Sequence, residues 1–386
     1  MTELKASLDA LTDVAGLRVG HARVPGAGAL SGTTVVLAPE GGMTAAVDVR
    51  GGGPGTRETD ALDPRNLVER IDAVVLTGGS AYGLDAAGGV MAWLEEQRRG
   101  VRVGPDPAHV VPVVPAACVF DLGRGGDFGA RPDASTGRAA VEAAAATAAH
   151  EPVVTGAVGA GTGAVVGGLK GGVGTASTVL ESGITVGALV VVNAVGAAID
   201  PETGVPYGAY FSSGTRTSVG RPAHPDPAVH EAARRRLAEA RARLAPPPMN
   251  TTLAVVATDA ALTRAQAQKF AGTAHDGIAR AVRPVHLLND GDTVFALATG
   301  ARELPSAPGP LALNAILAAG ADAVTRAIVR AVLTPSAGIS GPGGDFPAYR
   351  ELYGDAQADA YGTDRAGTEQ AGTDRAGTRG TGRTGD

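Results

Sequence analysis

Several stretches of this chain are apolar at nearly every position, and this pattern constrains the fold more than any other feature. They include TTVVLAPE, DAVVLTGG, GALVVVNAVG and TTLAVVATDA. A strand with one face in water alternates apolar and polar residues, whereas a strand covered on both faces does not have to. Two helical stretches lie between these runs, one with Ser80 as its N-cap and one from Ala134 to His150. We therefore expect an α+β protein built in layers, with helices outside the sheets.

Composition excludes several classes of protein. Glycine accounts for 57 of the 386 residues, roughly twice the usual share, but without the Gly-X-Y period of collagen. The formal net charge of −6 argues against a nucleic-acid partner. The single cysteine, Cys118, excludes an internal disulfide and a zinc site built on thiolates. Because the seven histidines lack metal-ligand spacing, we expect neither a metal nor another cofactor.

Nothing in the sequence favours a membrane or a secretory route. The longest apolar run, from Ile184 to Ile199, is too short to span a bilayer and contains Asn193. The first residues, MTELKASLDALTDV, carry acids where a signal peptide needs a basic start. We therefore expect no membrane contact and a cytoplasmic location.

Changes in composition divide the chain into four parts. Residues 1–211 hold most of the apolar runs, and residues 212–250 form a polar linker with a charged helix that the prolines at 246–248 end. Regular patterning resumes over residues 251–353, with a strand, a helix capped near Thr263 and a long apolar helix. Residues 354–386 repeat AGT and carry almost no apolar side chains, so we expect a disordered low-complexity tail.

Two motifs resemble functional signatures but fail on context. Residues Gly159 to Ala164 fit the spacing G-x-G-x-x-A of a dinucleotide site, which requires a helix to begin at once. The sequence that follows is too rich in glycine for a helix. Ser80 lies at a strand-to-helix turn, but Tyr82 replaces the second glycine of a G-x-S-x-G nucleophile elbow. We expect neither a nucleotide site nor a serine hydrolase of that type.

The junction between Asn250 and Thr251 combines a linker, three prolines and a hydroxyl residue at the start of a buried-type strand. One interpretation is only that a strand begins after a proline brake. The other is that Thr251 attacks the preceding carbonyl, so that the peptide bond becomes an ester and is then hydrolysed. The freed α-amino group, with an ordinary pKa of about 7.7–8.0, can serve as the base for the hydroxyl of the same residue. Such an enzyme needs no catalytic histidine.

Three polar residues are candidates to assist this nucleophile. Asp290 and Asp292, in NDGDT, can orient the amine if the segment is extended, although Asn-Asp-Gly is also a strong turn signal. Asn193 is a lone amide within VVVNAVG and must find hydrogen-bond partners if it is buried. It can act either as a structural amide or as a donor to a tetrahedral oxyanion, a role worth about 3 kcal/mol.

Seven blocks of the sequence resemble the L-aminopeptidase/D-esterase family. They are LTDVAGLRVGHA, GGGPGTRETDALDP, VVLTGGSAYGLDAAGGV, GLKGGVGTAS, VVVNAVG, MNTTLAVVATDAAL and DGDTVFALATG. They occur in this order, and the resemblance extends from about Leu11 to about Leu333. Each block alone is weak, but seven in order are specific. The family also contains β-peptidyl aminopeptidases and hydrolases of nylon (6-aminohexanoate) oligomers.

The resemblance implies a self-processing enzyme with a four-layer αββα sandwich of the N-terminal-nucleophile type, shared with ornithine acetyltransferase. Its precursor is cut into a large and a small subunit, and these heterodimers commonly assemble into tetramers.

Residue by residue, Thr251 matches the family's nucleophile, Asn250 the residue before the cut, and Asn193 the oxyanion amide. The pair Asp290 and Asp292 matches the nylon-oligomer hydrolases.

Two positions match the family less closely. Lys170 is the match to a family lysine, although the spacing around it differs by several residues. Phe120 stands where some members carry a substrate-site tyrosine, so a hydroxyl is missing there.

Three functions remain open from the sequence. The first is hydrolysis of amide bonds in peptides or small amides through a threonyl ester, with the Asp pair favouring the nylon-oligomer subgroup. The second is an acyltransferase like ornithine acetyltransferase, which passes the acyl group to an amine instead of water. The third is a non-catalytic oligomeric scaffold, in which Thr251 only begins a strand.

Overall fold

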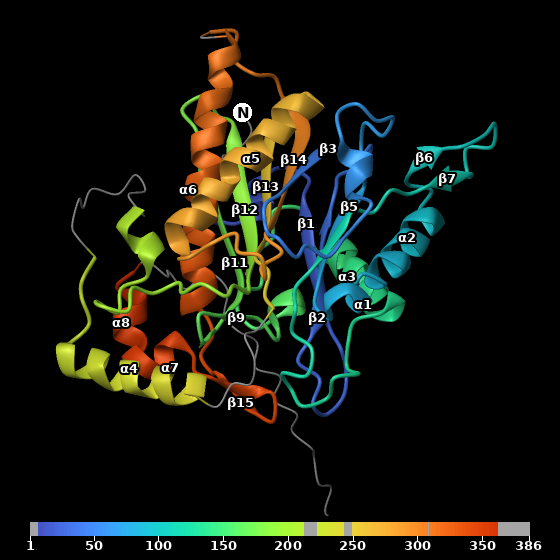
Figure 1. The fold of residues 1–386 in the computed structure, drawn as a ribbon. Coiled ribbons are helices and arrows are strands. Elements are labelled where there is room, and N and C mark those ends of the chain that lie inside the picture. Colours follow the sequence, from blue (N-terminus) through green and yellow to red (C-terminus); the bar gives the residue numbers. More distant parts are fainter. Residues whose placement is uncertain (1–6, 212–221, 243–248, 308, 362–386) are drawn as a thin grey trace, which may run out of the picture.

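The computed structural model describes residues 7–211, 222–242, 249–307 and 309–361. Two five-stranded sheets dominate them (Figure 1). The first sheet has the order β1 (Arg18–Arg23), β2 (Gly32–Leu37), β5 (Ala73–Thr77), β8 (Ala116–Cys118) and β4 (Thr56–Arg57). The second has the order β11 (Gly172–Val179), β12 (Thr185–Val192), β13 (Leu253–Ala260), β14 (Thr293–Arg302) and β3 (Thr44–Val49).

Helices cover the outer face of each sheet, so that the layers run helix, sheet, sheet, helix (Figure 1). The first sheet carries α2 (Ala86–Glu96) and α3 (Ala134–Ala146), and the second carries α5 (Arg264–Ala281) and α6 (Leu313–Leu333). Most neighbouring strands are antiparallel, but β13 and β14 are parallel because α5 connects them as a crossover. The expected four-layer α+β sandwich is confirmed.

Short elements complete the described chain. The helices are α1 (Ser80–Gly83), α4 (Pro227–Ala242), α7 (Tyr349–Tyr353) and α8 (Asp355–Asp359). The short strands pair as β6 (Val101–Arg102) with β7 (Val110–Val111), β9 (Val165–Val166) with β10 (Leu169–Lys170), and β15 (Ile339–Gly341) with β16 (Gly344–Phe346).

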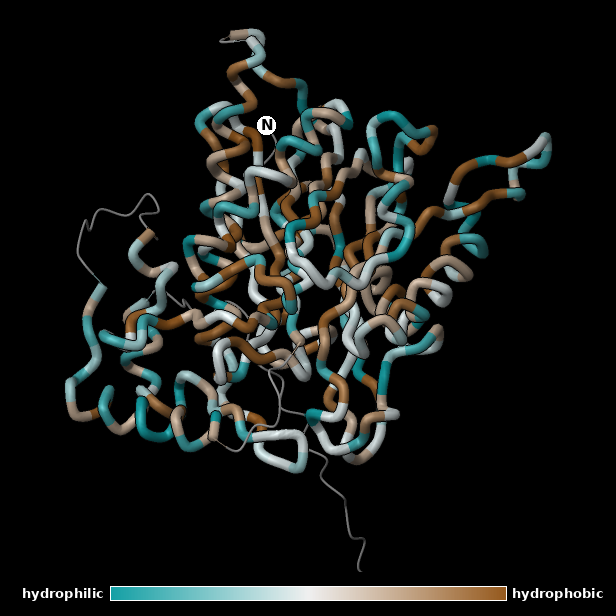
Figure 2. The backbone as a smooth tube through the Cα atoms, viewed as in Figure 1, coloured by the Kyte–Doolittle hydropathy of each residue, from teal (hydrophilic) through white to brown (hydrophobic). Residues whose placement is uncertain are grey.

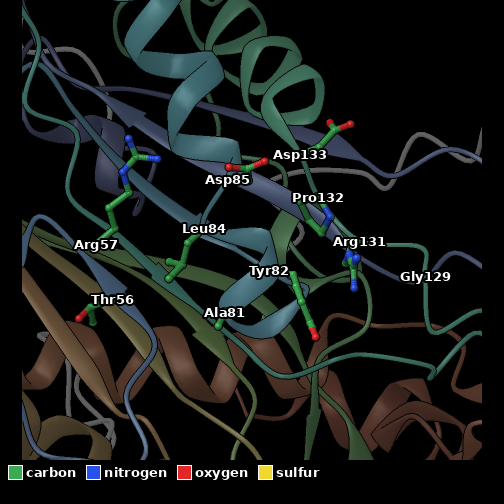
Figure 3. Close-up of a pocket in the computed structure, with 10 residues that line it drawn as sticks. All are labelled: Thr56, Arg57, Ala81, Tyr82, Leu84, Asp85, Gly129, Arg131, Pro132 and Asp133. Carbon is green, nitrogen blue, oxygen red and sulfur yellow. The ribbon is translucent and has the colours of Figure 1, made fainter.

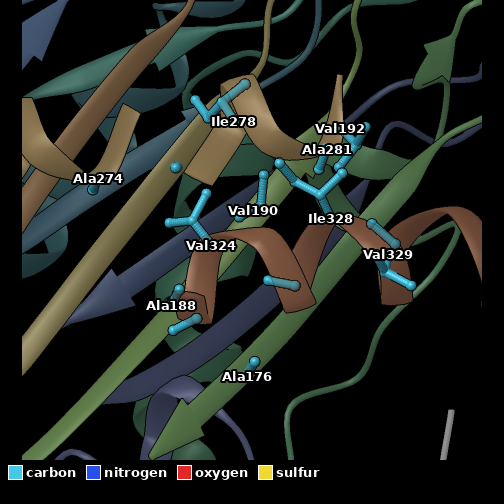
Figure 4. Close-up of a cluster of buried hydrophobic side chains, with 14 of the residues drawn as sticks. Ala176, Ala188, Val190, Val192, Ala274, Ile278, Ala281, Val324, Ile328 and Val329 are labelled. Carbon is cyan, nitrogen blue, oxygen red and sulfur yellow. The ribbon is translucent and has the colours of Figure 1, made fainter. Parts of the chain in front are cut away.

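The apolar runs are explained by burial on both faces of each strand. In β2, Val36 packs between the sheets while Val35 packs under α2 and α3. In β12, Leu189 faces the other sheet while Val190 packs against α5 and α6, in the cluster that Figure 4 shows. Figure 2 accordingly shows hydrophobic colour along the inner strands and hydrophilic colour on outer turns and on α4. Within the described residues, no helix is long and apolar enough to cross a bilayer.

Two of the expected helix starts have different outcomes. Thr263 caps α5 as predicted: its hydroxyl accepts from the Gln266 N–H at 3.2 Å, and the Gln266 side chain accepts from the Thr263 N–H at 2.8 Å. Ser80 is not a cap, because Gly79 occupies that position with a φ of +78° and Ser80 is already the first residue of α1. The helix expected to reach His150 ends at Ala146.

The predicted linker and tail are partly ordered. Helix α4 packs against α7 with Ala233 buried, and Arg236 forms an ion pair with Asp345 at 2.6 Å, so this part of the linker belongs to the core. Helix α8 lies within the predicted tail and buries Ala358, which corrects the tail boundary of 354. Residues 212–221, 243–248 and 362–386 lie outside the described residues.

Candidate active site

The peptide bond between Asn250 and Thr251 is buried at the N-terminal end of β13, the middle strand of the second sheet. Both residues are at most 4% exposed and precede β13, which begins at Leu253. The Thr251 N–H donates to the backbone oxygen of Asn193 at 2.5 Å. The Asn250 carbonyl accepts from the Gly291 N–H at 3.1 Å. The main chain therefore holds this peptide bond on both sides of the carbonyl carbon.

The Thr251 hydroxyl lies against the carbonyl group that it would attack. Its Oγ1 donates to the Asn250 carbonyl oxygen at 2.6 Å. Gly291 makes room for it, because a Cβ at this position would lie 2.6 Å from the same Oγ1. A side chain at residue 291 would therefore displace the hydroxyl, which explains the need for glycine here.

Asp290 and Asp292 lie on either side of this junction. Asp290 pairs with Asn250 as an isolated parallel bridge, and its Oδ1 accepts from the Val195 N–H at 3.2 Å. The Oδ1 of Asp292 accepts from the Thr252 N–H at 2.8 Å. Burial, and then the charge of Asp292, raise the pKa of Asp290 to about 6. The Asp290 N–H closes a turn onto Leu287, so the turn signal is also correct.

His286, which the sequence did not indicate, forms hydrogen bonds with the carboxylate of Asp292. His286 donates its backbone N–H to Asp292 Oδ2 at 3.1 Å, and its Nδ1 lies 2.8 Å from the same oxygen. The ring also lies edge-on to His275, with centroids 4.8 Å apart. The only sequence signal was a histidine six positions before an aspartate, which is too common to be informative.

Asn193 follows β12 and is fully buried. Its Oδ1 accepts from the Val165 N–H at 3.0 Å and from Arg124 Nη1 at 2.5 Å. Its Nδ2 donates to the Phe120 carbonyl at 3.3 Å. The amide is thus satisfied structurally in the uncut chain, and its oxyanion role stays a prediction.

Lys170 is buried but bonds only to main-chain oxygens. Its Nζ donates to the carbonyls of Gly161, Ala164 and Gly171 at 2.9, 3.1 and 2.6 Å. Burial lowers its pKa to about 7. The bonds to Gly161 and Ala164 fix the turn at 159–165, and the bond to Gly171 ties this turn to the start of β11. In the turn, a short 3₁₀ segment leads into β9 instead of the helix that a dinucleotide fingerprint needs.

Arg124 is the second buried cation and was not found from the sequence. It is 5% exposed, and its guanidinium donates to Asn193 Oδ1, to Asn250 Oδ1 at 2.7 Å and to the Gly163 carbonyl at 2.6 Å. Desolvation lowers its pKa to about 10, and the nearby Asp121 opposes that shift. It therefore links the candidate oxyanion amide of Asn193 to Asn250, the residue before the candidate cleavage site.

One cavity lies beside the junction, and a larger one adjoins it. The smaller, of about 290 Å³, is lined by Gly53, Pro54, Gly55, Ser80, Ala81, Cys118, Phe120, Met249, Asn250 and Thr251. Phe120 is therefore part of the wall next to the candidate nucleophile, and its contact with substrate stays a prediction. Burial raises the pKa of the Cys118 thiol to about 12, so it is not a competing nucleophile.

The larger cavity, of about 720 Å³, shares Ala81 with the smaller one (Figure 3). Its wall includes Tyr82, over whose ring the Arg131 guanidinium lies at 3.9 Å, and the charged residues Arg57 and Asp85. None of the predicted catalytic residues lines this cavity, whereas Thr251 lines the smaller one.

Comparison with known proteins identifies the family of this chain. The family model of peptidase family S58 matches residues 9–344. An uncharacterized aminopeptidase of Mycobacterium tuberculosis is 47% identical over 90% of this chain and 98% of its own length. A 6-aminohexanoate-oligomer endohydrolase of Kocuria sp. is 32% identical over 72% of each chain.

Solved structures share the fold. A β-aminopeptidase of Burkholderia sp. superposes with a TM-score of 0.62 at 25% identity, covering 92% of this chain and 94% of its own. An L-aminopeptidase D-Ala-esterase/amidase of Ochrobactrum anthropi, described as a variant of the Ntn hydrolase fold, gives 0.66 at 22% identity, covering 94% and 96%. The family match over most of the chain and the nearly full-length relatives show that this chain is a hydrolase belonging to peptidase family S58.

Proposed function

We propose that the chain cleaves its own bond between Asn250 and Thr251 and then hydrolyses amides with Thr251 as an N-terminal nucleophile. The observation that carries this proposal is the 2.6 Å contact between the Thr251 hydroxyl and the Asn250 carbonyl oxygen in a buried, well-held peptide. A threonine that only began a strand would not need to be buried beside two carboxylates and a glycine that makes room for its hydroxyl.

The proposed self-cleavage proceeds in two steps, formation of an ester and then its hydrolysis. Thr251 Oγ1 bonds to the Asn250 carbonyl carbon, the C–N bond breaks, and the hydroxyl proton passes to the nitrogen, which leaves an ester. Water then hydrolyses the ester, giving a carboxylate on Asn250 and restoring the Thr251 hydroxyl beside a free amine. The Gly291 N–H, already 3.1 Å from the carbonyl oxygen, donates to the developing oxyanion.

Turnover repeats this chemistry on a second amide. The free amine of Thr251 takes the hydroxyl proton as the oxygen attacks the substrate carbonyl, and it passes that proton to the leaving amine. Water then hydrolyses the threonyl ester. Asn193 is the second proposed oxyanion donor, which requires its Nδ2 to leave the Phe120 carbonyl. Asp290 and Asp292 fix the segment that carries the nucleophile and supply negative charge near its amine.

The two products of the cut would stay together. Strand β13, which follows the cut, pairs with β12 from the large part over residues Leu253 to Thr258. It also pairs with β14 on its other side, so the small part remains in the middle of the second sheet. Assembly of these heterodimers into tetramers stays a prediction.

The proposed substrates are peptides or small amides, including 6-aminohexanoate oligomers. The acid pair at 290 and 292 and the relatives named as oligomer endohydrolases support the last class. The cavity of about 290 Å³ beside Thr251 would hold the acyl group of such a substrate.

Trapping the ester tests the proposal. We would mix the cut protein with amino-acyl p-nitroanilides and with 6-aminohexanoate oligomers, quench within milliseconds and map the added mass by peptide mass spectrometry. We expect the acyl group on the peptide that begins at Thr251, and no adduct in Thr251→Ala. An adduct on another residue, or hydrolysis by Thr251→Ala at the wild-type rate, would overturn it.

A further inference from the structure

Arg124 carries a buried positive charge that the proposed chemistry does not use. Its three hydrogen bonds all go to neutral oxygens, those of Asn193, Asn250 and Gly163. Among the described residues no carboxylate forms an ion pair with this guanidinium, and the charge of the nearby buried Asp121 only partly offsets the cost of removing it from water. A functional reason is therefore expected for keeping it there. The contact that stands out is Nη2 to Asn250 Oδ1 at 2.7 Å, because Asn250 is the residue that self-cleavage would release.

The position of Asn250 defines where the acyl part of a substrate must lie. Self-cleavage and turnover would use the same hydroxyl and the same Gly291 N–H, so the two acyl groups must occupy the same place relative to Thr251. Asn250 lines the cavity beside Thr251, whereas Arg124 does not line it and contacts the Asn250 side chain. When Asn250 withdraws after the cut, Arg124 Nη2 loses its acceptor and faces the vacated space.

We propose that Arg124 recognises the acyl side of the bond to be cut, first through the Asn250 side chain and then through an equivalent acceptor on the substrate. This rests on the proposed self-cleavage at Asn250. The acceptor would be the oxygen of a carboxamide or carboxylate group that two carbons separate from the reacting carbonyl, as in asparaginyl, aspartyl or succinamoyl amides. A buried guanidinium donor left without a partner is penalised, so acyl groups that lack this oxygen bind and react less well.

Arg124 also acts on the far side of the site. Its Nη1 holds Asn193 Oδ1 at 2.5 Å, and the backbone oxygen of Asn193 holds the Thr251 N–H at 2.5 Å. The Arg124 side chain therefore aligns the residue before the cut directly. It also holds the side chain of Asn193, whose backbone oxygen aligns the residue after the cut. It is a positioning residue for self-cleavage and a specificity-determining residue for the substrate.

The first test is a double-mutant cycle on the rate of self-cleavage. We would make four proteins by cell-free synthesis: wild type, Arg124→Gln, Asn250→Leu and the double variant. The rate at which each uncut chain is converted to fragments would be followed on gels. Each single variant should slow the cut about tenfold to a hundredfold, because a hydrogen bond to a charged group is lost. The double variant should be no slower than the slower single one. Rates that multiply, or a single variant within twofold of wild type, would overturn the proposal.

A matched control removes an arginine elsewhere. Arg99 bonds to Asp72 and to the carbonyls of Ala38 and Pro39, away from the junction. Arg99→Gln should cut at the wild-type rate. If Arg124→Gln does not fold, the cleavage rate of Asn250→Leu still tests the proposal. This variant leaves Arg124 in place and removes only the Asn250 Oδ1 acceptor.

The second test uses the cut wild-type protein and needs no change at Arg124. We would compare kcat/KM for asparaginyl, aspartyl and leucyl p-nitroanilides, since leucine has nearly the shape of asparagine without the oxygen. The kcat/KM for the asparaginyl or the aspartyl p-nitroanilide, or for both, should be at least about tenfold higher than that for the leucyl p-nitroanilide. Equal rates, or a faster leucyl amide, would overturn the inference. Failure of the underlying function looks different, because then no fragment beginning at Thr251 would form at all.

Discussion

The two buried cations, Lys170 and Arg124, lie near the same turn but make different kinds of contact. Lys170 bonds only to three main-chain carbonyls, two of them in the turn at 159–165. Arg124 bonds to the carbonyl of Gly163 in that turn and also to the side chains of Asn193 and Asn250. The family resemblance points to the lysine, yet the arginine contacts the residue before the cut.

This difference indicates that the two cations hold the site in different ways, one indirectly and one directly. Lys170 fixes the Ala164 carbonyl, and the next residue, Val165, donates its N–H to Asn193 Oδ1. The lysine therefore reaches the site through the turn, whereas Arg124 reaches it directly. On this account, loss of Lys170 should act mainly on folding stability, and loss of Arg124 mainly on cleavage.

The largest effect is expected from Thr251→Ala, which removes the reacting hydroxyl but neither cation. The chain should stay uncut and inactive after long incubation, because no other group replaces the nucleophile. Its free energy of unfolding should fall by only about 1–2 kcal/mol relative to freshly made, still uncut wild type, since one buried hydroxyl and one methyl group are lost. Intact mass and urea unfolding measure the two properties. A variant that is still cut would show that neither cation supports a threonine-based reaction.

Next in size is Lys170→Met, made in the uncut Thr251→Ala background. Three charge-assisted hydrogen bonds are lost and a desolvation cost is relieved, so we expect a net loss of about 3 kcal/mol in the free energy of unfolding. Urea denaturation measures it, with Lys269→Met on the exposed face of α5 as the matched control. Unchanged stability together with abolished cleavage in the Thr251 form would instead make Lys170 a catalytic residue.

The pH dependence of stability should carry the signature of Lys170. Its folded pKa is lowered to about 7 from an ordinary 10.5, so between these values the unfolded chain holds the proton more tightly. Stability should therefore rise with pH above about 7, by at most about 1.4 kcal/mol per unit. Lys170→Met should flatten this rise, and Lys269→Met should keep it. An identical slope in both variants would argue against a buried, titrating Lys170.

A smaller effect of opposite sign is expected from Asp121, beside Arg124. Burial raises its pKa to about 6, so the folded state binds the proton more tightly than the unfolded one. Stability should fall as pH rises from about 4 to 6, and Asp121→Asn should remove part of that fall. Asp290 contributes a similar fall, so Asp290→Asn should remove another part. Urea midpoints at pH 4, 5 and 6 test this, and slopes unchanged in both variants would contradict it.

The fold was largely predictable because burial on both faces leaves a direct signature in sequence. Val35 and Val36 pack on opposite sides of one strand, and both are apolar. Thr263 was predictable as a cap because its partner, Gln266, lies three residues away. Ser80 was not, because the left-handed conformation of Gly79 that displaces it depends on contacts distant in sequence.

The site was predictable only where chemistry stands out locally. Thr251 follows a proline stop, and Asn193 is a lone amide in an apolar strand, so both attract notice. Arg124 lies in LGRGGD, which reads as a surface loop, and its amide partners are 69 and 126 residues away. No pattern within a short window connects such residues, so only the folded chain reveals the arginine.

The central claim is that the chain is cut before Thr251. The most direct measurement is intact mass of the purified wild-type protein together with the N-terminal sequence of each species. The account predicts two fragments that remain associated, the smaller beginning Thr251-Thr252-Leu253. A single intact chain after long incubation at neutral pH, or a fragment that begins elsewhere, would contradict it.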